Sequence, residues 1–241
     1  MEEMNSNKKA TNKFQPKGMT ILHEDDDIIV IDKSSGLLSM ASDKENEKTA
    51  YFLLTDYVRK GNYKSKNRVF IVHRLDKDTS GVLVFAKTEE AKNYLQDNWQ
   101  EFHKEYFAVV HGKFKNRDGI IESYLAENSI HRMYSVENPE EGKFAKTGYR
   151  VFKTNKKFTM LKIDLFTGRK NQIRVHLAEK GHPVAGDKMY GNEDKDIARL
   201  ALHAGCIRLT HPTTQEEMVF MAEIPAYFKT LVKKEKIQNL D

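Results

Sequence analysis

A short polar segment between two apolar stretches carries the side chains best suited to covalent chemistry. Residues 73–81 read HRLDKDTSG, with VFIV before them and VLVFA directly after them. A carboxylate can act as a covalent nucleophile when it is held in one orientation and partly removed from water. Leu75, whose side chain is expected to point into the core, would fix the neighbouring Asp76. The residues from Asp78 to Gly81 are typical of a polar turn bonded to its own backbone, and from this loop alone a structural turn is the better interpretation.

A second segment combines a glycine, three cations and the start of a predicted helix. Residues 167–176 read TGRKNQIRVH, so that Arg169, Lys170 and Arg174 fall within six positions. Free backbone N–H groups at a helix N-terminus attract phosphate or carboxylate. Arg169 and Arg174 lie five positions apart and point in different directions, so one could meet an internal carboxylate and the other an RNA phosphate. A helix start with solvated cations explains the same pattern equally well.

A third segment places an aromatic side chain on a predicted strand. Residues 104–112 read KEYFAVVHG, and strand alternation puts Tyr106, Ala108 and Val110 on one face. Taken alone, Tyr106 is better interpreted as a core or edge aromatic. The alternative is a platform on which a nucleic-acid base stacks while the hydroxyl reaches a polar partner.

The elements that must position these segments are short strands and a few helices. Apolar and β-branched runs predict strands, and apolar residues at helical spacing after a capping threonine predict helices. The predicted strands are 20–24, 28–33, 69–72, 82–86, 106–112, 119–125, 144–153, 158–165, 199–209 and 217–223. The predicted helices are 49–60, 88–102, 171–181 and 226–237. Strands outnumber helices and several follow hairpin-length turns, which favours an α+β fold with a large, mainly antiparallel or mixed sheet flanked by helices.

The composition fits one globular domain with a basic surface. The 241 residues include 39% hydrophobic side chains and carry a net charge of +5. Residues 1–18 are polar and predict a flexible tail, and because no linker-like stretch follows, a single domain is expected over residues 19–238. Net charge alone is weak evidence for a nucleic-acid partner, but the cations gathered before residues 73–81 are a better sign.

Membrane and secretory classes find no support in the sequence. No apolar run approaches the ~20 residues that span a bilayer, and the first residues, MEEMNSNKKATNK, lack the apolar stretch of a secretory signal. Cys206 is the single cysteine, so neither an intramolecular disulfide nor a cysteine-based metal site is expected. We therefore expect a cytoplasmic protein without a membrane partner.

Residues 73–88, HRLDKDTSGVLVFAKT, closely resemble the signature of RluA-type pseudouridine synthases. Further stretches resemble the same family in the same order: IIVIDKSSGLL, KEYFAVVHG, TGRKNQIRVHLAEKGHPVAGDKMYG and LHAGCIRLTHP. The resemblance covers about residues 20–228. The first signature and the TGR-x-x-QIR-x-H segment together are far more specific than a lone short motif, so the resemblance favours the catalytic interpretation of Asp76.

The resemblance implies an isomerase that converts uridine in RNA into pseudouridine without a metal or other cofactor. Asp76 matches the aspartate that attacks the target nucleoside. Tyr106 matches the aromatic residue that stacks on the uracil, and Arg174 matches the basic residue that pairs with the aspartate. Such a pair would keep Asp76 ionised in a closed pocket, where an unpaired carboxylate would take up a proton.

RNA contacts are expected around these three residues. Arg74 matches the arginine that fills the space left by the flipped nucleotide, and we expect Arg169, Lys170 and Gln172 to bind RNA. Only about 19 residues precede the first predicted strand, so the S4 RNA-binding domain of many relatives is expected to be missing. The expected partner is a compact stem-loop of tRNA or rRNA, bound by a monomer.

Two positions depart from the pattern of the family. Ser34 stands where proline is usual, and Asn171 stands where histidine is usual. Ser34 should affect only the stiffness of its loop. Asn171 keeps a hydrogen-bonding side chain but loses the ring, which leaves the contact at that position open.

Two other functions remain as alternatives. The first is a non-catalytic RNA-binding or RNA-folding protein on the same fold, which the loss of Asp76, Tyr106 or Arg174 would have favoured. The second is a hydrolase that uses Asp76 and Asp78 as a carboxylate pair, although nothing in their spacing brings the two carboxylates to one site.

Overall fold

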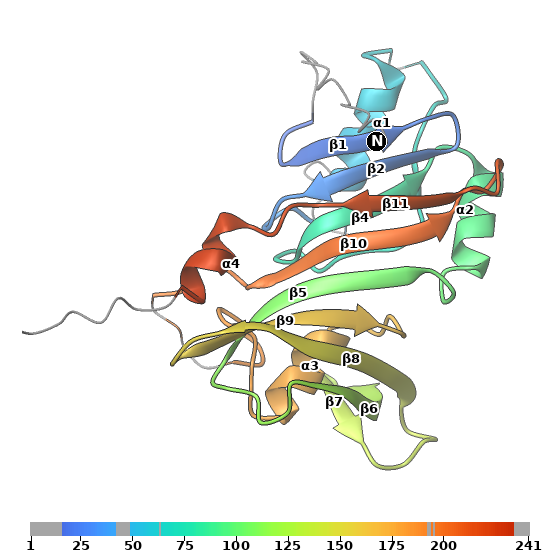
Figure 1. Cartoon of the computed structure of the whole chain (residues 1–241). Coiled ribbons are helices and arrows are strands. Elements are labelled where there is room, and N and C mark those ends of the chain that lie inside the picture. The colour runs from blue at the N-terminus through green and yellow to red at the C-terminus, as the bar shows by residue number, and fades with distance from the viewer. Residues whose placement is uncertain (1–15, 42–48, 63, 192–193, 195, 234–241) are drawn as a thin grey trace, which may run out of the picture.

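The computed structural model describes residues 16–41, 49–62, 64–191, 194 and 196–233, and one large sheet runs through them. The strands are β1 (Met19–Glu24), β2 (Ile28–Lys33), β3 (Phe70–Ile71), β4 (Ser80–Ala86), β5 (His103–His111), β6 (Asp118–Glu127), β7 (Met133–Val136), β8 (Lys143–Thr154), β9 (Phe158–Leu165), β10 (Leu202–Thr210) and β11 (Glu217–Met221). They are joined in the order β1-β2-β4-β10-β5-β9-β8-β6-β7, with β11 beside β10 and β3 beside β4. This order runs down Figure 1 from β1 to β7. The pairing of β4 with β10 is parallel and the other pairings are antiparallel, which confirms the predicted mixed sheet.

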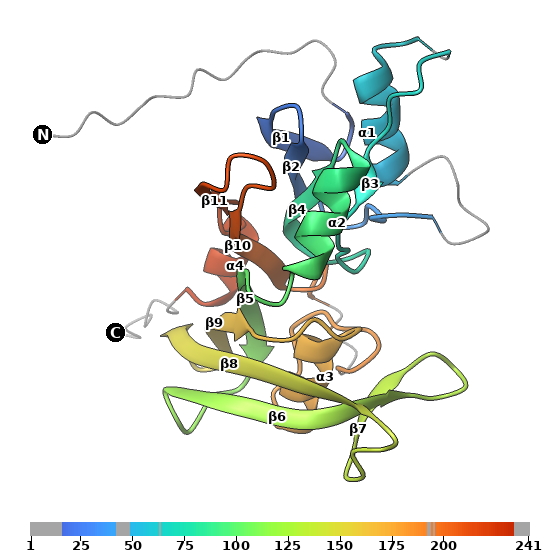
Figure 2. The same cartoon turned by 90° about the vertical axis from the view of Figure 1, so that its right-hand side faces the viewer.

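Four helices flank the described part of the sheet: α1 (Ala50–Arg59), α2 (Glu89–Asp97), α3 (Gln172–Glu179) and α4 (Ala226–Leu231). The predicted caps of the first two are confirmed. Thr49 accepts a hydrogen bond from the N–H of Phe52 at 3.2 Å, and Thr88 accepts one from the N–H of Ala91 at 3.1 Å. Figure 2 shows α3 in the curve of β6, β7 and β8, against which it packs. No helix among the described residues has the length and apolar character that crossing a membrane requires.

Several predicted boundaries were wrong, each for a local reason. α2 ends at Asp97 rather than at residue 102, because the chain turns through residues 98–102 to enter β5. β7 was missed, since its exposed Tyr134 and short length leave little strand pattern. Ser80 belongs to β4 rather than to the polar turn. Residues 1–15 of the predicted tail and 234–237 of the last predicted helix lie outside the described residues, and the domain bounds 19–238 stay a prediction.

The core divides between the two halves of the sheet. Alternate residues of β2 face opposite sides, so that Ile29 and Ile31 pack with α1 while Ile28 and Val30 pack with α2. A larger cluster in the other half includes residues of β5, β9 and α3. Tyr106 of β5 packs against both the α1 cluster and this larger cluster. The side chain predicted to stack on a base therefore lies where the two halves of the core meet.

The parallel junction of β4 and β10 brings the polar loop to the centre of the sheet. Gly81 pairs with Ala204 there. Gly81 has φ +114°, and a Cβ atom at this position would lie 2.1 Å from the carbonyl oxygen of Ala204. Only glycine fits so close an approach in this backbone conformation. Residues 72–79, which lead into β4, are thereby placed next to β5 and β10.

Candidate active site

The loop that carries Asp76 is held by hydrogen bonds to the loop after β2. The hydroxyl of Ser39 donates to the carbonyl of Leu75 at 2.8 Å and accepts from its N–H at 3.0 Å. The ammonium of Lys33 donates to the carbonyl of Lys77 at 3.1 Å. Leu75 is buried, as the sequence predicts. These bonds fix the backbone on both sides of Asp76.

Lys33 is a buried cation that the sequence analysis did not single out. Its side chain is fully buried, and it also donates to the carbonyls of Ser34 and Leu37 at 3.1 and 2.7 Å. Burial lowers the pKa of Lys33 to about 8, although the charges of Asp78 and Asp76 act to raise it. The strand pattern contained a signal, because alternation puts Lys33 on the same face of β2 as Ile29 and Ile31.

Asp76 is joined to Arg174, as predicted, and Arg174 is joined to a second carboxylate. Nη1 of Arg174 lies 3.1 Å from Oδ2 of Asp76. Nε and Nη2 of the same guanidinium donate to the two oxygens of Asp187 at 2.7 and 2.8 Å. The side chain of Asp187 is 0% exposed and that of Arg174 is 12% exposed. Asp187 therefore binds Nε and Nη2 of the guanidinium, and Nη1 is left for Asp76.

The pKa shifts in this cluster follow from burial and pairing. Burial acts to raise the pKa of Asp187, but the hydrogen bonds and charge of Arg174, with the N–H groups of Tyr190 and Met189, lower it below its ordinary value. Burial acts to lower the pKa of Arg174, but Asp187 and Asp76 raise it above its ordinary value. Asp187 and Arg174 are therefore both ionised at neutral pH. Sequence reasoning missed Asp187, although it lies in the stretch GHPVAGDKMYG that resembles the family.

Asn171 contacts Asp76, which answers the question left open by this position. Its amide nitrogen donates to Oδ2 of Asp76 at 2.7 Å. Its amide oxygen accepts from the hydroxyl of Tyr190 at 3.3 Å. The residue that stands in place of the usual histidine is therefore in direct contact with the predicted nucleophile.

A cavity of about 270 Å³ opens beside Asp76. Its lining includes Asp76, Tyr106, Arg174, Leu165 and Ile173, so that the three residues predicted to be catalytic share one cavity. Burial and the charge of Asp76 raise the pKa of Tyr106, which keeps its hydroxyl protonated at neutral pH. Small-molecule sites have a largely apolar lining with a few oriented polar groups, and this cavity combines an aromatic face with a paired carboxylate.

One wall of the cavity is an aromatic and cationic cluster that the sequence did not reveal. The rings of His73 and Trp99 are stacked with centroids 4.1 Å apart, and Nε2 of His73 accepts from the N–H of Val84 at 3.0 Å. Nζ of Lys104 donates to the carbonyl of Trp99 at 2.7 Å. Burial and the charge of Lys104 lower the pKa of His73 to about 3. Alternation along β5, which puts Lys104 on the face of Tyr106, was the available signal.

The four predicted RNA-binding residues have different surroundings. Arg74 is exposed and lines the cavity beside Asp76. Arg169 also lines it, and its Nε donates to the carbonyl of Phe144 at 2.9 Å. Lys170 lies 2.6 Å from a carboxylate oxygen of Glu127, which offsets its charge.

Gln172 does not have the exposed position expected of an RNA-binding residue. It is 2% exposed. Its amide oxygen accepts from Thr167 and from the N–H of Arg169 at 2.7 and 3.0 Å, and its nitrogen donates to Lys146 and Thr147 at 3.0 and 2.9 Å. The side chain thus shapes the turn before α3. Because an amide at a helix start suits either role, its spacing could not predict which one applies.

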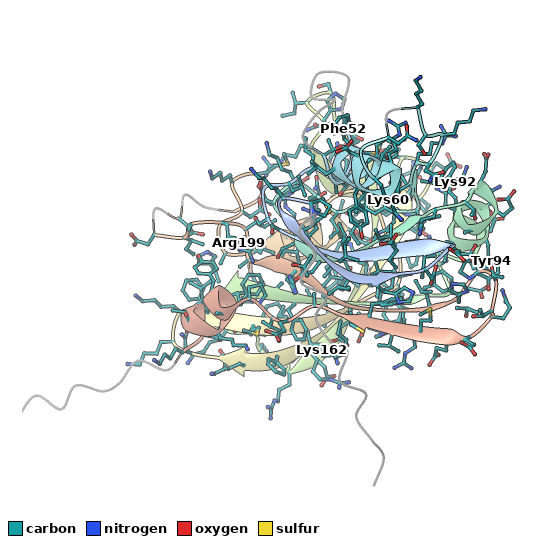
Figure 3. All side chains as sticks on the ribbon, turned by 90° about the horizontal axis from the view of Figure 1, so that it is seen from above. Phe52, Lys60, Lys92, Tyr94, Lys162 and Arg199 are labelled. Atoms are coloured by element: carbon teal, nitrogen blue, oxygen red, sulfur yellow. The ribbon has the colours of Figure 1, made fainter. Side chains whose placement is uncertain are left out.

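A second hollow, of about 600 Å³, shares Asp76, Asn171 and Arg174 with the first cavity. Its lining adds cations at Lys77, Lys170, Lys188 and Arg199. Arg199, labelled in Figure 3, donates to the hydroxyl of Ser80 at 3.2 Å and lies over the ring of Phe228. The Asp76–Arg174 pair is therefore bordered by two hollows, one with an aromatic face and one rich in cations.

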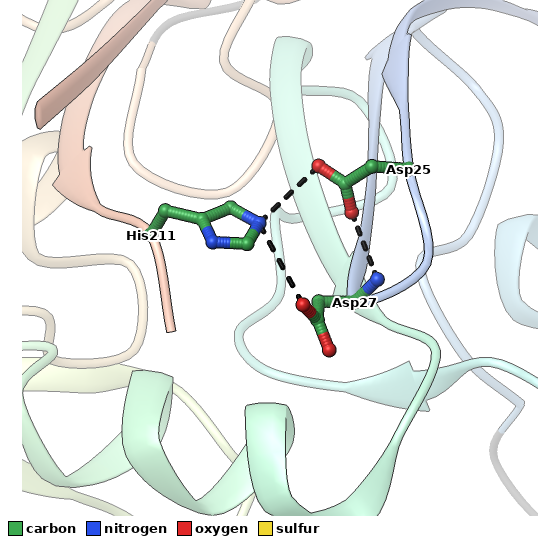
Figure 4. Close-up of side chains that lie close together, drawn as sticks. All are labelled: Asp25, Asp27 and His211. Atoms are coloured by element: carbon green, nitrogen blue, oxygen red, sulfur yellow. Dashed lines mark hydrogen bonds and ion pairs between the residues drawn. The ribbon is translucent and has the colours of Figure 1, made fainter. Parts of the chain in front are cut away.

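Asp25, Asp27 and His211, drawn in Figure 4, form a group with the residue types of a metal site. Nε2 of His211 lies 3.3 Å from Asp25 and 3.9 Å from Asp27. Its Nδ1 accepts from the N–H groups of Thr213 and Thr214, so the proton of the neutral ring is on Nε2. A metal ligand must offer a lone pair there, and we interpret the group as a hydrogen-bonded link between the β1–β2 turn and the β10–β11 hairpin.

Comparisons with known proteins identify the family of this chain. A family model described as RNA pseudouridylate synthase matches residues 27–179. Ribosomal large subunit pseudouridine synthase D of Nitrosomonas europaea is 37% identical over 235 residues, which cover 92% of this chain and 66% of that protein. An uncharacterized RNA pseudouridine synthase of Bacillus subtilis is 34% identical, with 89% of this chain and 72% of that protein covered.

Solved structures show the same fold. Human RNA Pseudouridylate Synthase Domain Containing 4 matches with a TM-score of 0.72 at 22% identity, over 87% of this chain and 90% of that chain. Human RNA Pseudouridylate Synthase Domain Containing 1 matches with a TM-score of 0.68 at 23% identity, over 85% of this chain and 83% of that chain. The family resemblance predicted from the sequence motifs is confirmed. Since the family model matches more than half of the chain, the chain belongs to the RNA pseudouridylate synthase family.

Proposed function

We propose that this protein isomerises uridine in RNA to pseudouridine, with Asp76 as the nucleophile. The observation that carries the proposal is the shared cavity of Asp76, Tyr106 and Arg174, in which the carboxylate is paired but still reachable. Asp76 attacks the nucleoside as the bond between ribose carbon 1′ and uracil nitrogen 1 breaks. The uracil rotates and joins carbon 1′ through its carbon 5 as the bond that Asp76 made to the nucleoside breaks. Carbon 5 loses its proton and nitrogen 1 gains one, so no net proton is lost. Because the product is an isomer of the substrate, the proposal needs no oxidant and no cofactor.

The surroundings of the cavity support a flipped nucleotide as the bound form of the substrate. Tyr106 stacks on the uracil, and Arg74 fills the space that the nucleotide leaves in the RNA. Extrusion of a base costs a few kcal/mol, and stacking on an aromatic side chain contributes about 1–3 kcal/mol per base. Arg169 and three cations of the second hollow, Lys77, Lys170 and Lys188, bind the flanking phosphates.

The RNA we propose is a structured stem-loop of rRNA or tRNA, bound by a monomer in the cytoplasm. The name of the relative from Nitrosomonas europaea supports rRNA, since that protein is called a ribosomal large subunit synthase. The single catalytic domain over residues 19–238 binds this RNA through the basic surface around the cavity. A reaction on ribosomal or transfer RNA needs no membrane partner.

The test is product analysis after the purified protein is incubated with unmodified rRNA and tRNA transcripts. We expect pseudouridine in one or a few defined loops, with no released uracil. Released uracil would instead indicate the hydrolase that uses Asp76 and Asp78. Tight RNA binding without any change in the nucleosides would favour the non-catalytic RNA-binding protein. Comparing pseudouridine maps of rRNA and tRNA from cells with and without the gene identifies the position.

A further inference from the structure

Asn171 occupies the N-cap of α3 but does not cap the helix. Asparagine is among the preferred N-cap residues because its side-chain oxygen accepts from N–H groups of the first turn. Asn171 makes no such bond, and its backbone is in the left-handed region at φ 51°, ψ 16°. Asparagine tolerates this region better than most residues. Its side chain instead donates to Asp76 at 2.7 Å, so local helix stability is given up for a contact with the carboxylate.

Tyr190 fixes which end of the Asn171 amide faces Asp76. The hydroxyl of Tyr190 accepts from the N–H of Met133 at 3.0 Å, which leaves its own proton to donate. That proton goes to the amide oxygen of Asn171, 3.3 Å away. The amide nitrogen must then point toward Asp76. A chain of hydrogen bonds thus runs from the backbone of β7 through two side chains to the carboxylate.

Both donors to Asp76 bind the same oxygen. Asn171 and Arg174 donate to Oδ2 at 2.7 and 3.1 Å. Among the residues that the structure describes, none donates to Oδ1. An oxygen with two donors shares its electron density with them, so Oδ1 keeps the more available lone pairs. Rotation of the carboxylate, which would exchange the two oxygens, would break both bonds.

The two donors to Asp76 differ in charge, because Arg174 is a cation and the amide of Asn171 is neutral. Asp187 accepts hydrogen bonds from two nitrogens of Arg174, so a single guanidinium is paired with two carboxyl groups, those of Asp187 and Asp76. Asn171 adds a second donor to Asp76 without adding a second positive charge. The carboxylate is therefore held in place by two donors, of which only one is a cation.

We propose that Asn171 is a positioning residue for the nucleophile. With Arg174 it holds Oδ2 of Asp76, so that Oδ1 is the oxygen that attacks, and Tyr190 keeps the amide turned toward the carboxylate. This inference rests on the proposed role of Asp76.

Two substitutions at Asn171 separate positioning from a structural role. Asn171→Gly removes the amide in a backbone region that glycine adopts freely. Its single-turnover rate should fall about ten- to a hundredfold, the change that follows from losing a hydrogen bond to a charged group, with RNA affinity unchanged. Asn171→Asp keeps the shape, suits a helix N-terminus and tolerates the left-handed region. A structural role predicts full activity for this variant, whereas positioning predicts a larger loss than in Asn171→Gly.

The pH profile of the same variants gives an independent measurement. The second carboxylate in Asn171→Asp opposes ionisation of Asp76, so the acidic limb of the pH–rate profile should move to higher pH. Tyr190→Phe, which frees the amide to turn, should lower the rate without this movement. If Asn171→Asp fails to fold, Asn171→Gly and Tyr190→Phe decide the question.

The outcomes distinguish this inference from the proposed function. If Asp76→Asn keeps turnover, the proposed function is wrong and the inference falls with it. If Asp76→Asn is inactive while Asn171→Gly and Asn171→Asp keep the wild-type rate and pH profile, only the role of Asn171 is overturned. A loss of RNA affinity that accounts for the whole loss of rate would also overturn it.

Discussion

Replacing Arg174 with methionine should destabilise the protein in a pH-dependent way. The substitution keeps a long apolar side chain but removes the donors to Asp76 and Asp187. Among the described residues, Asp187, whose side chain is 0% exposed, then keeps only the N–H groups of Met189 and Tyr190 as donors. Breaking a buried ion pair by removing one partner costs about 3–5 kcal/mol.

Protonation of Asp187 limits this cost and gives it a pH signature. Holding a carboxyl with an ordinary pKa of 3.8 protonated costs about 1.36 kcal/mol for each pH unit above that value, or about 4.4 kcal/mol at pH 7 and about 1.6 kcal/mol at pH 5. In the variant the folded-state pKa of Asp187 lies above its unfolded value, so the folded state binds more protons. Stability of the variant therefore falls as pH rises from about 4 to 7.

Urea denaturation at pH 5 and pH 7 measures the effect. We expect the free-energy difference between wild type and Arg174→Met to be about 2.7 kcal/mol larger at pH 7 than at pH 5. Arg208→Met is the matched control, because Arg208 is exposed and lies 3.8 Å from the exposed Glu217; its loss should stay below about 1 kcal/mol.

A double variant separates stability from activity. Arg174→Met with Asp187→Leu removes the stranded carboxylate and should regain much of the lost free energy of unfolding. It should not regain activity, because Asp76 still lacks its charged partner. A loss in Arg174→Met that is below about 1 kcal/mol and the same at both pH values would show that Arg174 does not neutralise a buried carboxylate.

Three further predictions concern charge elsewhere in the chain. The pKa of Lys33 is about 8 in the folded protein and 10.5 ordinarily, so the unfolded state binds the proton of Lys33 more strongly. Between pH 8 and pH 10.5, the free energy of unfolding of the wild type should therefore rise relative to that of Lys33→Met. Urea denaturation measures this difference, and a constant difference would contradict the prediction. Burial lowers the pKa of His203 to about 4, so the free energy of unfolding should fall as pH drops from about 6.5 toward 4. His203→Gln should reduce this fall. The same fall in the wild type and in His203→Gln would count against the prediction. Arg169→Ala should weaken RNA binding and reduce the slope of log affinity against log salt by about one. Arg150 is an exposed arginine outside the cavity lining, and Arg150→Ala should change neither quantity. Equal slopes in RNA titrations of the wild type and both variants would show that Arg169 binds no phosphate.

The Asp76–Arg174 pair could be predicted because both residues lie in long, specific motifs. Asp187 and Tyr190 lie in a motif too, but their roles depend on how the segment after α3 folds back onto the helix, which spacing along the chain does not show. Gln172 is a different case, and its role in RNA binding stays a prediction. Its place beside two cations suggested RNA, while its amide is used inside the turn.

Strands were predicted well where both faces are buried and less well at the edge. β2 begins with the apolar run 28–31 and β4 contains the apolar run 82–86, and the positions of both strands follow from these runs. β7 is short and half exposed, so the pairing with β6, rather than its own sequence, makes it a strand. The burial of Lys33 is the same kind of case, since lysine is almost never fully buried and only the face that it shares with Ile31 indicated it.

The central claim is that Asp76 is the nucleophile of an RNA isomerase, and one paired measurement tests it most directly. Asp76→Asn and Asp78→Asn each remove one negative charge from the same loop, but Asp76 lines the cavity with Tyr106 and Arg174 while Asp78 is exposed. Single-turnover pseudouridine formation and RNA affinity are measured for both variants on the transcript that the wild type modifies. We predict that Asp76→Asn forms no pseudouridine and binds RNA about as well as the wild type, while Asp78→Asn stays active. Pseudouridine formation by Asp76→Asn at the wild-type rate would contradict the account.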